Sequence, residues 1–363
     1  MQMEERAEVQ EELAFSGEAG PEEESLPPTR IRQPKRRKFA LLLAYSGKGL
    51  SGMQINPGVE TVESELFKAL RLEGIIEPGD EDKPLSRHLP SQIRAIEMKR
   101  AVRSFDSQKS CDSRTYSYTL PTYAFAHLDE ISNEEFRLTE ERRAEVNRLL
   151  EKYKGTHNFF NYTSRREHGD ASCKRYIIGF ECGAPFLVER SGSSLEMATI
   201  NVHGQSFMMH QIRKMIGMCI AIVRGLAGVQ DIEKSWQNSR MDVPMAPGLG
   251  LVLEKPHYHM YDQRFGKDHV HLDTWENEEQ VEDFRNKFIR ADIFDTEIGE
   301  KSMMKWLETL LLHKFNGAED EEEEEPSDPK RPRMSLPHFH AVVQKEGIEP
   351  EASKLSAEDK AKS

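Results

Sequence analysis

The feature that most constrains the fold is the order of strand-like and helix-like segments between Lys38 and Phe315. Period-two alternation or a short apolar run indicates a strand, and apolar residues spaced by three or four indicate a helix. The strand patterns lie at 39–45, 114–120 and 196–203, and the helix patterns lie at 61–70, 139–153 and 207–223. Because strand pairs and strand–helix units are mixed, we predict an α/β (α+β) fold with a largely antiparallel mixed sheet flanked by helices. A doubly wound parallel sheet is not expected.

The body of the chain opens with a strand, a glycine loop and a helix. Residues 39–45 form a continuous apolar run that ends at Ser46-Gly47-Lys48-Gly49, which predicts a strand buried on both faces. Thr61 then has the side chain of a helix N-cap, and Glu63 lies near the positive end of the helix dipole.

The net charge of −13 is confined to the ends of the chain. Residues 1–30 hold nine acids and two arginines, and residues 319–325 are seven consecutive acids. These two segments carry −14 together, so the remainder carries about +1 and can present basic surfaces to a polyanion. Residues 1–36 and 316–363 are poor in aromatic side chains and rich in Glu, Pro and Ser, and we expect disordered tails there.

Two short basic runs lie at the borders of these tails. The first is Pro34-Lys35-Arg36-Arg37-Lys38 and the second is Pro329-Lys330-Arg331-Pro332-Arg333. Such runs are typical of nuclear-import signals or of arms that contact phosphate, and the alternative is a solvated charge run. We expect a nuclear protein.

Several functional classes lose support from the sequence. No window approaches the roughly 20 apolar residues of a membrane helix, and no secretory or transit peptide is recognisable. The four cysteines form no CxxC pair, and His257 and His259 have no further ligands at metal-site spacing, so we expect no metal. The P-loop, GxGxxG, GxSxG and HExxH motifs are absent.

Two tyrosines on the 114–120 strand are candidates for chemistry. Tyr116 and Tyr118 are two residues apart, so both rings leave the same face of the sheet, beside Arg114. Tyrosines at this spacing most often fill a core. The alternative is a phenol in a pocket that stacks on a base or moves a proton.

The 207–223 helix pattern is apolar except for His210, Arg213 and Lys214. The three-residue spacing of His210 and Arg213 predicts a common helix face. A buried arginine must be paired or line a cavity, so Arg213 either satisfies a carbonyl or carboxylate, or contacts RNA phosphate or a catalytic carboxylate. Farther along, Gly248 and Gly250 suit a close backbone approach to a ligand.

Six ordered segments give the chain a family resemblance. They are Leu43–Gly49 with Gly52–Gln54, Arg114–Tyr118, Tyr153–Phe159, Cys173–Ile177, Gly204–Met215 and Ala246–Leu251. Together they resemble the eukaryotic branch of the TruA-type tRNA pseudouridine synthases, over residues 37–312. The resemblance implies a catalytic domain with an N-terminal lobe at 37–125, a C-terminal lobe at 126–262 and a helical extension at 263–315.

The resemblance also implies a reaction and its residues. In this family an aspartate attacks the target uridine, the base detaches, rotates and rejoins the ribose through C5, and a tyrosine assists removal of the C5 proton. The tyrosine matches Tyr116, and the arginine that contacts the aspartate matches Arg213; no cofactor is implied. The expected RNA-binding residues are Lys35, Arg36, Arg37, Lys38, Arg114, His210 and Lys214. The expected partners are tRNA and other RNAs, and a monomer is favoured although the sequence does not reveal the oligomeric state.

The family's aspartate has no match in this chain. Relatives of this type carry it in an Arg-Thr-Asp pattern, followed by a strand and a helix, before a His-Leu-Pro-Ser segment. Here Arg87 runs directly into His88, and Asp80 and Asp82 lie in a polar loop that does not resemble the pattern. Three readings remain: an inactive variant of the enzyme, a catalytically silent RNA-binding protein, and a poorly folded splice product. The first lobe is expected to lack that strand and helix.

Overall fold

The computed structural model describes residues 37–72, 88–190 and 192–315. The strands are β1 Lys38–Tyr45, β2 Ile93–Ala101, β3 Ser113–Pro121, β4 Gly155–Asn158, β5 Lys174–Cys182, β6 Phe186–Arg190, β7 Ser193–Gly204 and β8 Leu251–His257. The α-helices are α1 Val62–Leu72, α2 Glu140–Glu151, α3 Gln211–Val223, α4 Gln230–Lys234, α5 His259–Phe265, α6 Glu278–Phe284, α7 Ala291–Glu300 and α8 Ser302–Leu310. Short 3₁₀ turns cover Thr122–Phe125, Phe160–Tyr162 and Ala171–Cys173, and a π-helix covers Arg285–Arg290. None of the helices in these ranges is long and apolar enough to cross a membrane.

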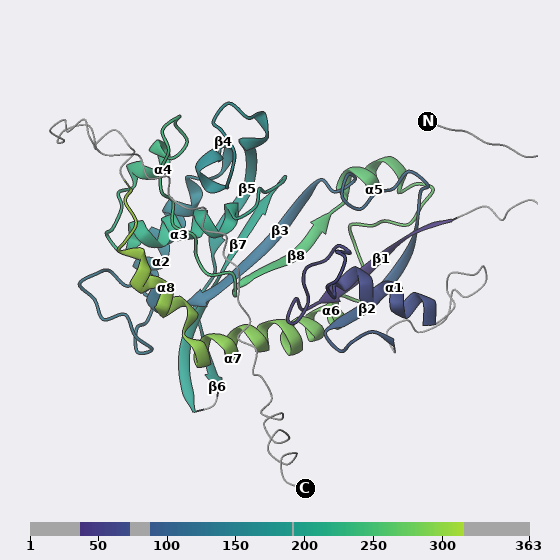
Figure 1. The fold of residues 1–363 in the computed structure, drawn as a ribbon, viewed down its shortest axis with the longest axis horizontal. Coiled ribbons are helices and arrows are strands. Elements are labelled where there is room, and N and C mark those ends of the chain that lie inside the picture. Colours follow the sequence, from purple (N-terminus) through teal and green to yellow (C-terminus); the bar gives the residue numbers. More distant parts are fainter. Residues whose placement is uncertain (1–36, 73–87, 191, 316–363) are drawn as a thin grey trace, which may run out of the picture. The chain divides into compact units, whose positions relative to one another are not determined.

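The larger sheet has the order β4-β5-β7-β3-β8, with β6 paired to another stretch of β7 (Figure 1). Every pairing in it is antiparallel, which confirms the predicted α/β fold with an antiparallel sheet. The alternation of β3 sends Tyr118 and Leu120 into the main core, where α2 and α3 pack against them.

The two helices on this core follow from local sequence signals. Thr139 accepts a hydrogen bond from the backbone N–H of Arg142, so it is the N-cap of α2, and the predicted stripe from Val146 to Tyr153 is buried. Helix α3 is almost wholly apolar and is buried from Met215 to Val223, since it lies between the sheet and the segment around Pro244. Gly217 is required there, because an added Cβ would lie 2.2 Å from the Pro244 carbonyl oxygen.

The smaller sheet corrects one prediction. Strand β1 pairs with β2 alone among the described strands, and none of its residues is fully buried, so the prediction of a strand buried on both faces was wrong. An apolar run shows that a strand has apolar side chains to bury. How much of their surface is buried depends on the strands and helices that pack against it. The predicted cap of α1 is confirmed, because Thr61 Oγ1 accepts a hydrogen bond from the backbone N–H of Ser64 at 3.2 Å.

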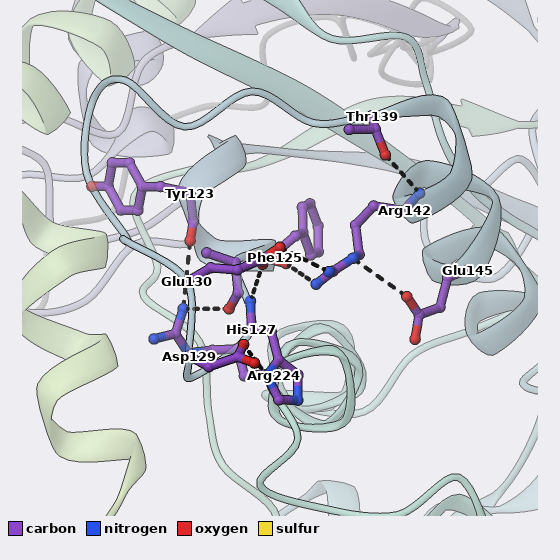
Figure 2. A network of polar contacts seen from close by, with 10 residues as sticks. Tyr123, Phe125, His127, Asp129, Glu130, Thr139, Arg142, Glu145 and Arg224 are labelled. Atoms are coloured by element: carbon purple, nitrogen blue, oxygen red, sulfur yellow. Dashed lines mark hydrogen bonds and ion pairs between the residues drawn. The ribbon is translucent and has the colours of Figure 1, made fainter.

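Two arginines hold the C-terminal end of α3 beside the connection from β3 to α2 (Figure 2). Arg224, which follows α3, is 8% exposed and donates to the carbonyl of Ala126 at 3.0 Å. Arg142 donates to the carbonyl of Phe125 at 3.0 Å and pairs with Glu130 at 3.2 Å. Because both guanidinium groups bind the same turn, the end of α3 is held against it, and the opposite end of α3 carries Arg213.

Charged groups attach the C-terminal helices to β8 and to the 3₁₀ turn after β3. Glu297 of α7 is 4% exposed and accepts hydrogen bonds from the hydroxyl of Tyr123 and the backbone N–H of Met303, each at 3.0 Å. Arg285 pairs with Glu254 of β8 at 2.8 Å. Burial raises the pKa of Glu297, and its two donors oppose that shift.

Candidate active site

Tyr116 and Tyr118 lie on the same face of β3 but in different surroundings. Tyr118 is 1% exposed, and its hydroxyl donates to the carbonyl of Pro247 at 2.7 Å, so it fills the core as tyrosines at this spacing commonly do. Tyr116 is only partly buried, and its ring meets Phe207 edge to face with centroids 5.4 Å apart. Of the two, Tyr116 is the phenol that a substrate could reach.

The Tyr116 hydroxyl has no hydrogen-bond partner within the described ranges, which leaves it open to a ligand. Burial raises the pKa of Tyr116, and the nearby Arg114 guanidinium partly opposes that shift. The phenol therefore keeps its proton near neutral pH. An acceptor or a base supplied with the substrate would be needed for it to move a proton.

Arg213 lies in the first turn of α3 and is aimed at the turn before β8. Its Nε donates to the carbonyl of Ala246 at 2.6 Å, and the backbone N–H of Ala246 donates back to the Arg213 carbonyl at 3.2 Å. Gly248 lies beside the guanidinium, where an added Cβ would make an ordinary contact at 3.7 Å, so this approach does not require a glycine. The sequence predicts that Arg213 could satisfy a carbonyl, and this bond does so for its Nε–H group.

The remaining donors of Arg213 have no carboxylate partner in the part of the chain that the structure describes. Its side chain is partly buried, where an arginine is normally paired. Burial raises the pKa of the adjacent Tyr118, an effect that Arg213 opposes, so a cation and a phenol lie close together under this turn. The terminal nitrogens of Arg213 are therefore donors to which an anion could bind.

The prediction that His210 and Arg213 share a helix face was wrong. Helix α3 begins at Gln211, and His210 precedes it with φ of 68°, in the left-handed region that few residues other than glycine adopt. The apolar pattern continues through the turn at 207–210, so periodicity alone could not locate the first helical residue. His210 is partly exposed, and burial is the largest cause that lowers its pKa, ahead of the neighbouring Arg213.

The other predicted RNA-binding residues are spread over several elements. Lys214 donates to the carbonyl of Asn161 at 2.9 Å, and burial lowers its pKa. Lys38, at the start of β1, donates to the carbonyl of Phe105 at 2.6 Å, and Arg37 beside it is exposed. Arg114 lies on β3 near Tyr116, whereas Lys35 and Arg36 lie outside the described residues. Only Arg114, His210 and Lys214 lie on β3 or at the start of α3.

The glycine and histidine motifs have structural roles. Gly250 approaches the chain's own backbone and not a ligand, because an added Cβ would lie 2.0 Å from the Thr119 carbonyl oxygen. His157 stacks on Trp236 with centroids 3.8 Å apart. His257 ends β8 and hydrogen-bonds Thr115 at 2.8 Å, and no group of three potential metal ligands occurs among the residues that could be described.

Sequence reasoning did not foresee the contacts that surround Arg213 and Tyr116. Phe207 packs on Tyr116 and Ala246 binds Arg213, although each pair is separated by more than 30 positions in the chain. Each residue lies inside a segment that the sequence analysis noted, yet no local pattern shows which segments meet.

Comparison with known proteins identifies the family. Residues 149–259 match the family described as tRNA pseudouridine synthase. The chain is 44% identical over 336 residues to the mouse protein named pseudouridylate synthase 1 homolog, covering 81% of this chain and 78% of that protein. The human protein of the same name is 44% identical over 319 residues, covering 77% and 74%. A Yarrowia lipolytica protein named tRNA pseudouridine synthase 1 is 29% identical over 392 residues, covering 74% and 73%.

The fold and these similarities place the chain in a family of α/β isomerases. The chain belongs to the tRNA pseudouridine synthases, in their eukaryotic TruA-type branch.

The alignments also show that the relatives contain residues with no counterpart in this chain. In the mouse comparison, 81% of 363 residues is about 294 residues, whereas the alignment extends over 336 positions. About 42 aligned positions therefore hold no residue of this chain. The human comparison gives about 39 such positions, since 77% of 363 is about 280 against 319.

Proposed function

We propose that this chain binds tRNA as the pseudouridine synthases do but does not isomerise uridine, because it lacks the nucleophile. The observation that carries the proposal is Arg213, a partly buried arginine in the Gly204–Met215 segment, whose guanidinium has no carboxylate within the described residues. In the family the matching arginine contacts the catalytic aspartate. The acid that would complete this pair is the one missing from the sequence.

The length of the alignments supports the same proposal. About 40 positions of the mouse and human proteins face no residue here, which is the size expected for a segment carrying the Arg-Thr-Asp pattern, a strand and a helix. Such a segment would also explain why β1 pairs with β2 alone among the described strands. Asp80 and Asp82 lie outside the described residues, in the loop where the sequence differs from the pattern.

The residues that remain can bind and orient a uridine but cannot start the reaction. Arg213 would attract an anionic group, and Tyr116 presents a protonated phenol beside Phe207, on which a base could stack. The covalent step needs a carboxylate that attacks the nucleoside and is later released. Without that group the base does not detach, so the C5 proton that Tyr116 would help remove is never exposed to exchange. Other RNAs with an accessible uridine would be held in the same way.

A binding experiment tests the proposal directly. We expect the full chain to bind a tRNA transcript in a filter or fluorescence assay, with affinity falling at least about tenfold between 50 and 200 mM salt, because phosphate contacts release counterions. Bound tRNA should contain no pseudouridine after long incubation at stoichiometric protein. Weak binding that does not depend on salt would contradict RNA recognition, and a non-cooperative thermal transition would favour the poorly folded reading.

We further propose that the chain is nuclear, from the two basic runs at 34–38 and 329–333. A fluorescent fusion too large to diffuse through nuclear pores should accumulate in the nucleus. Alanine at the basic residues of both runs should move it to the cytoplasm, while the matched change of Lys152 and Lys154, a basic pair in the folded body, should not. Nuclear fluorescence that persists after loss of both runs would rule out these signals.

A further inference from the structure

The N-terminal end of α3 lacks the groups that normally satisfy a helix N-terminus. His210 precedes the helix without a side-chain cap, and no acidic residue lies in the first turn. The backbone N–H groups of Ile212 and Arg213 have no hydrogen-bond acceptor among the described residues. The first N–H groups of a helix carry partial positive charge and need an acceptor. The first turn of this 13-residue helix therefore has donors that an anion could satisfy.

Gln211 gives an independent indication of a ligand. Its side chain is 0% exposed, and its Oε1 accepts a hydrogen bond from the backbone N–H of Met208 at 2.9 Å. That bond holds the amide across the turn that leads into α3. Its Nε2 is buried and has no hydrogen-bond partner among the residues that the structure describes. Because a buried donor without an acceptor destabilises a protein, the free amide indicates an acceptor that arrives with a ligand.

The charges around this turn are cationic. Arg175 of β5 donates to the hydroxyl of Ser206 at 2.6 Å, and its Nε is buried without a partner. Lys214 donates to the carbonyl of Asn161, its only hydrogen-bond partner in the described part of the chain. Burial lowers the pKa of Lys214 and Asp242 opposes that shift, but the Asp242 carboxylate already pairs with His313 at 2.7 Å. Within the described ranges neither Arg175 nor Lys214 forms an ion pair. The cations here are thus available to a ligand.

This turn is distinct from the place beside the Arg213 side chain. Gln211 and Lys214 are three residues apart and share one face of α3. The Arg213 side chain extends to Ala246 from a different face of the helix. Met209, within the turn itself, is 73% exposed, so the turn reaches solvent at this residue.

We propose that the N-terminal turn of α3 binds one phosphate of the RNA backbone. The N–H groups of Ile212 and Arg213 and the Gln211 amide would donate to its oxygens, and Lys214 and Arg175 would neutralise its charge. Several converging neutral donors together with two cations suit a phosphate better than a single carboxylate, which has fewer acceptor oxygens. This inference rests on the proposed RNA binding and names the contact that contributes to it.

The test compares two substitutions with a matched control in tRNA binding at several salt concentrations. Lys214→Met keeps the aliphatic stem and removes the charge, and we expect weaker binding and a salt slope (log K against log salt) that is shallower by about 1. Gln211→Met removes a neutral donor, and we expect roughly tenfold weaker binding with an unchanged slope. Lys267→Met, which removes an exposed charge elsewhere, should change neither quantity.

The outcomes separate this inference from the proposed function. If the unchanged chain does not bind tRNA, the proposed function fails. If it binds and Lys214→Met retains both the affinity and the slope of the unchanged chain, the phosphate site is wrong. If Gln211→Met lowers the midpoint of thermal unfolding, its weaker binding could reflect lost packing. The salt slope of Lys214→Met then decides whether the phosphate site exists, since that slope depends on charge and not on packing.

Discussion

Uridine-labelled tRNA incubated with the purified chain should release no C5 tritium above background. The same chain with a relative's Arg-Thr-Asp segment inserted between Arg87 and His88 should release it. The reason is that the covalent step requires a positioned carboxylate, and removal of a nucleophile commonly costs at least about 10⁴-fold in rate. In the restored chain Arg213 would gain the carboxylate that it lacks among the described residues.

Two controls keep the restoration experiment specific. Asn in place of the inserted aspartate should abolish release while keeping the segment's packing. Tyr116→Phe in the restored chain should slow release, because only the hydroxyl is lost and the ring contact with Phe207 is retained. Tritium release by the chain as it stands would refute the proposal that it is catalytically silent.

The largest expected effect on stability is from Gly250→Ala. Its Cβ would lie 2.0 Å from the Thr119 carbonyl oxygen, and the Thr119 backbone N–H also donates to the Gly250 carbonyl at 3.0 Å. The turn that leads into β8 would have to move away from β3, since the obstacle is backbone and cannot rotate away. We expect a loss of about 3 kcal/mol or more in the free energy of unfolding.

Gly179→Ala is the matched control for this prediction. Gly179 lies in strand β5, and an added Cβ there meets nothing within 4 Å, so the free energy of unfolding of this variant should change by less than about 0.5 kcal/mol. Denaturant unfolding of the two variants gives both values. Equal unfolding midpoints for Gly250→Ala and Gly179→Ala would show that stability does not depend on the close approach of Gly250 to Thr119.

Local signals in the sequence were sufficient for much of the fold. Thr61 was expected to cap a helix and does so, because a cap depends on residues within three positions. The alternation of β3 placed Tyr116 and Tyr118 on one face, since side chains in a strand alternate whatever the strand's neighbours are. Two other predictions failed. The burial of β1 depended on how many strands pair with it, and the start of α3 was not visible in the apolar pattern, because His210 has a left-handed backbone.

The sequence by itself determined three strands and three helices in their order, the family resemblance, the two candidate residues Tyr116 and Arg213, and the lack of an Arg-Thr-Asp segment. Only the tertiary structure decided that Tyr118 is a core residue, that Arg213 binds the carbonyl of Ala246, and that the first turn of α3 retains unsatisfied donors. The physical reason is the range of the interactions. Periodicity and capping act over a few residues, whereas the partner of a charge or a donor is set by segments that meet after folding.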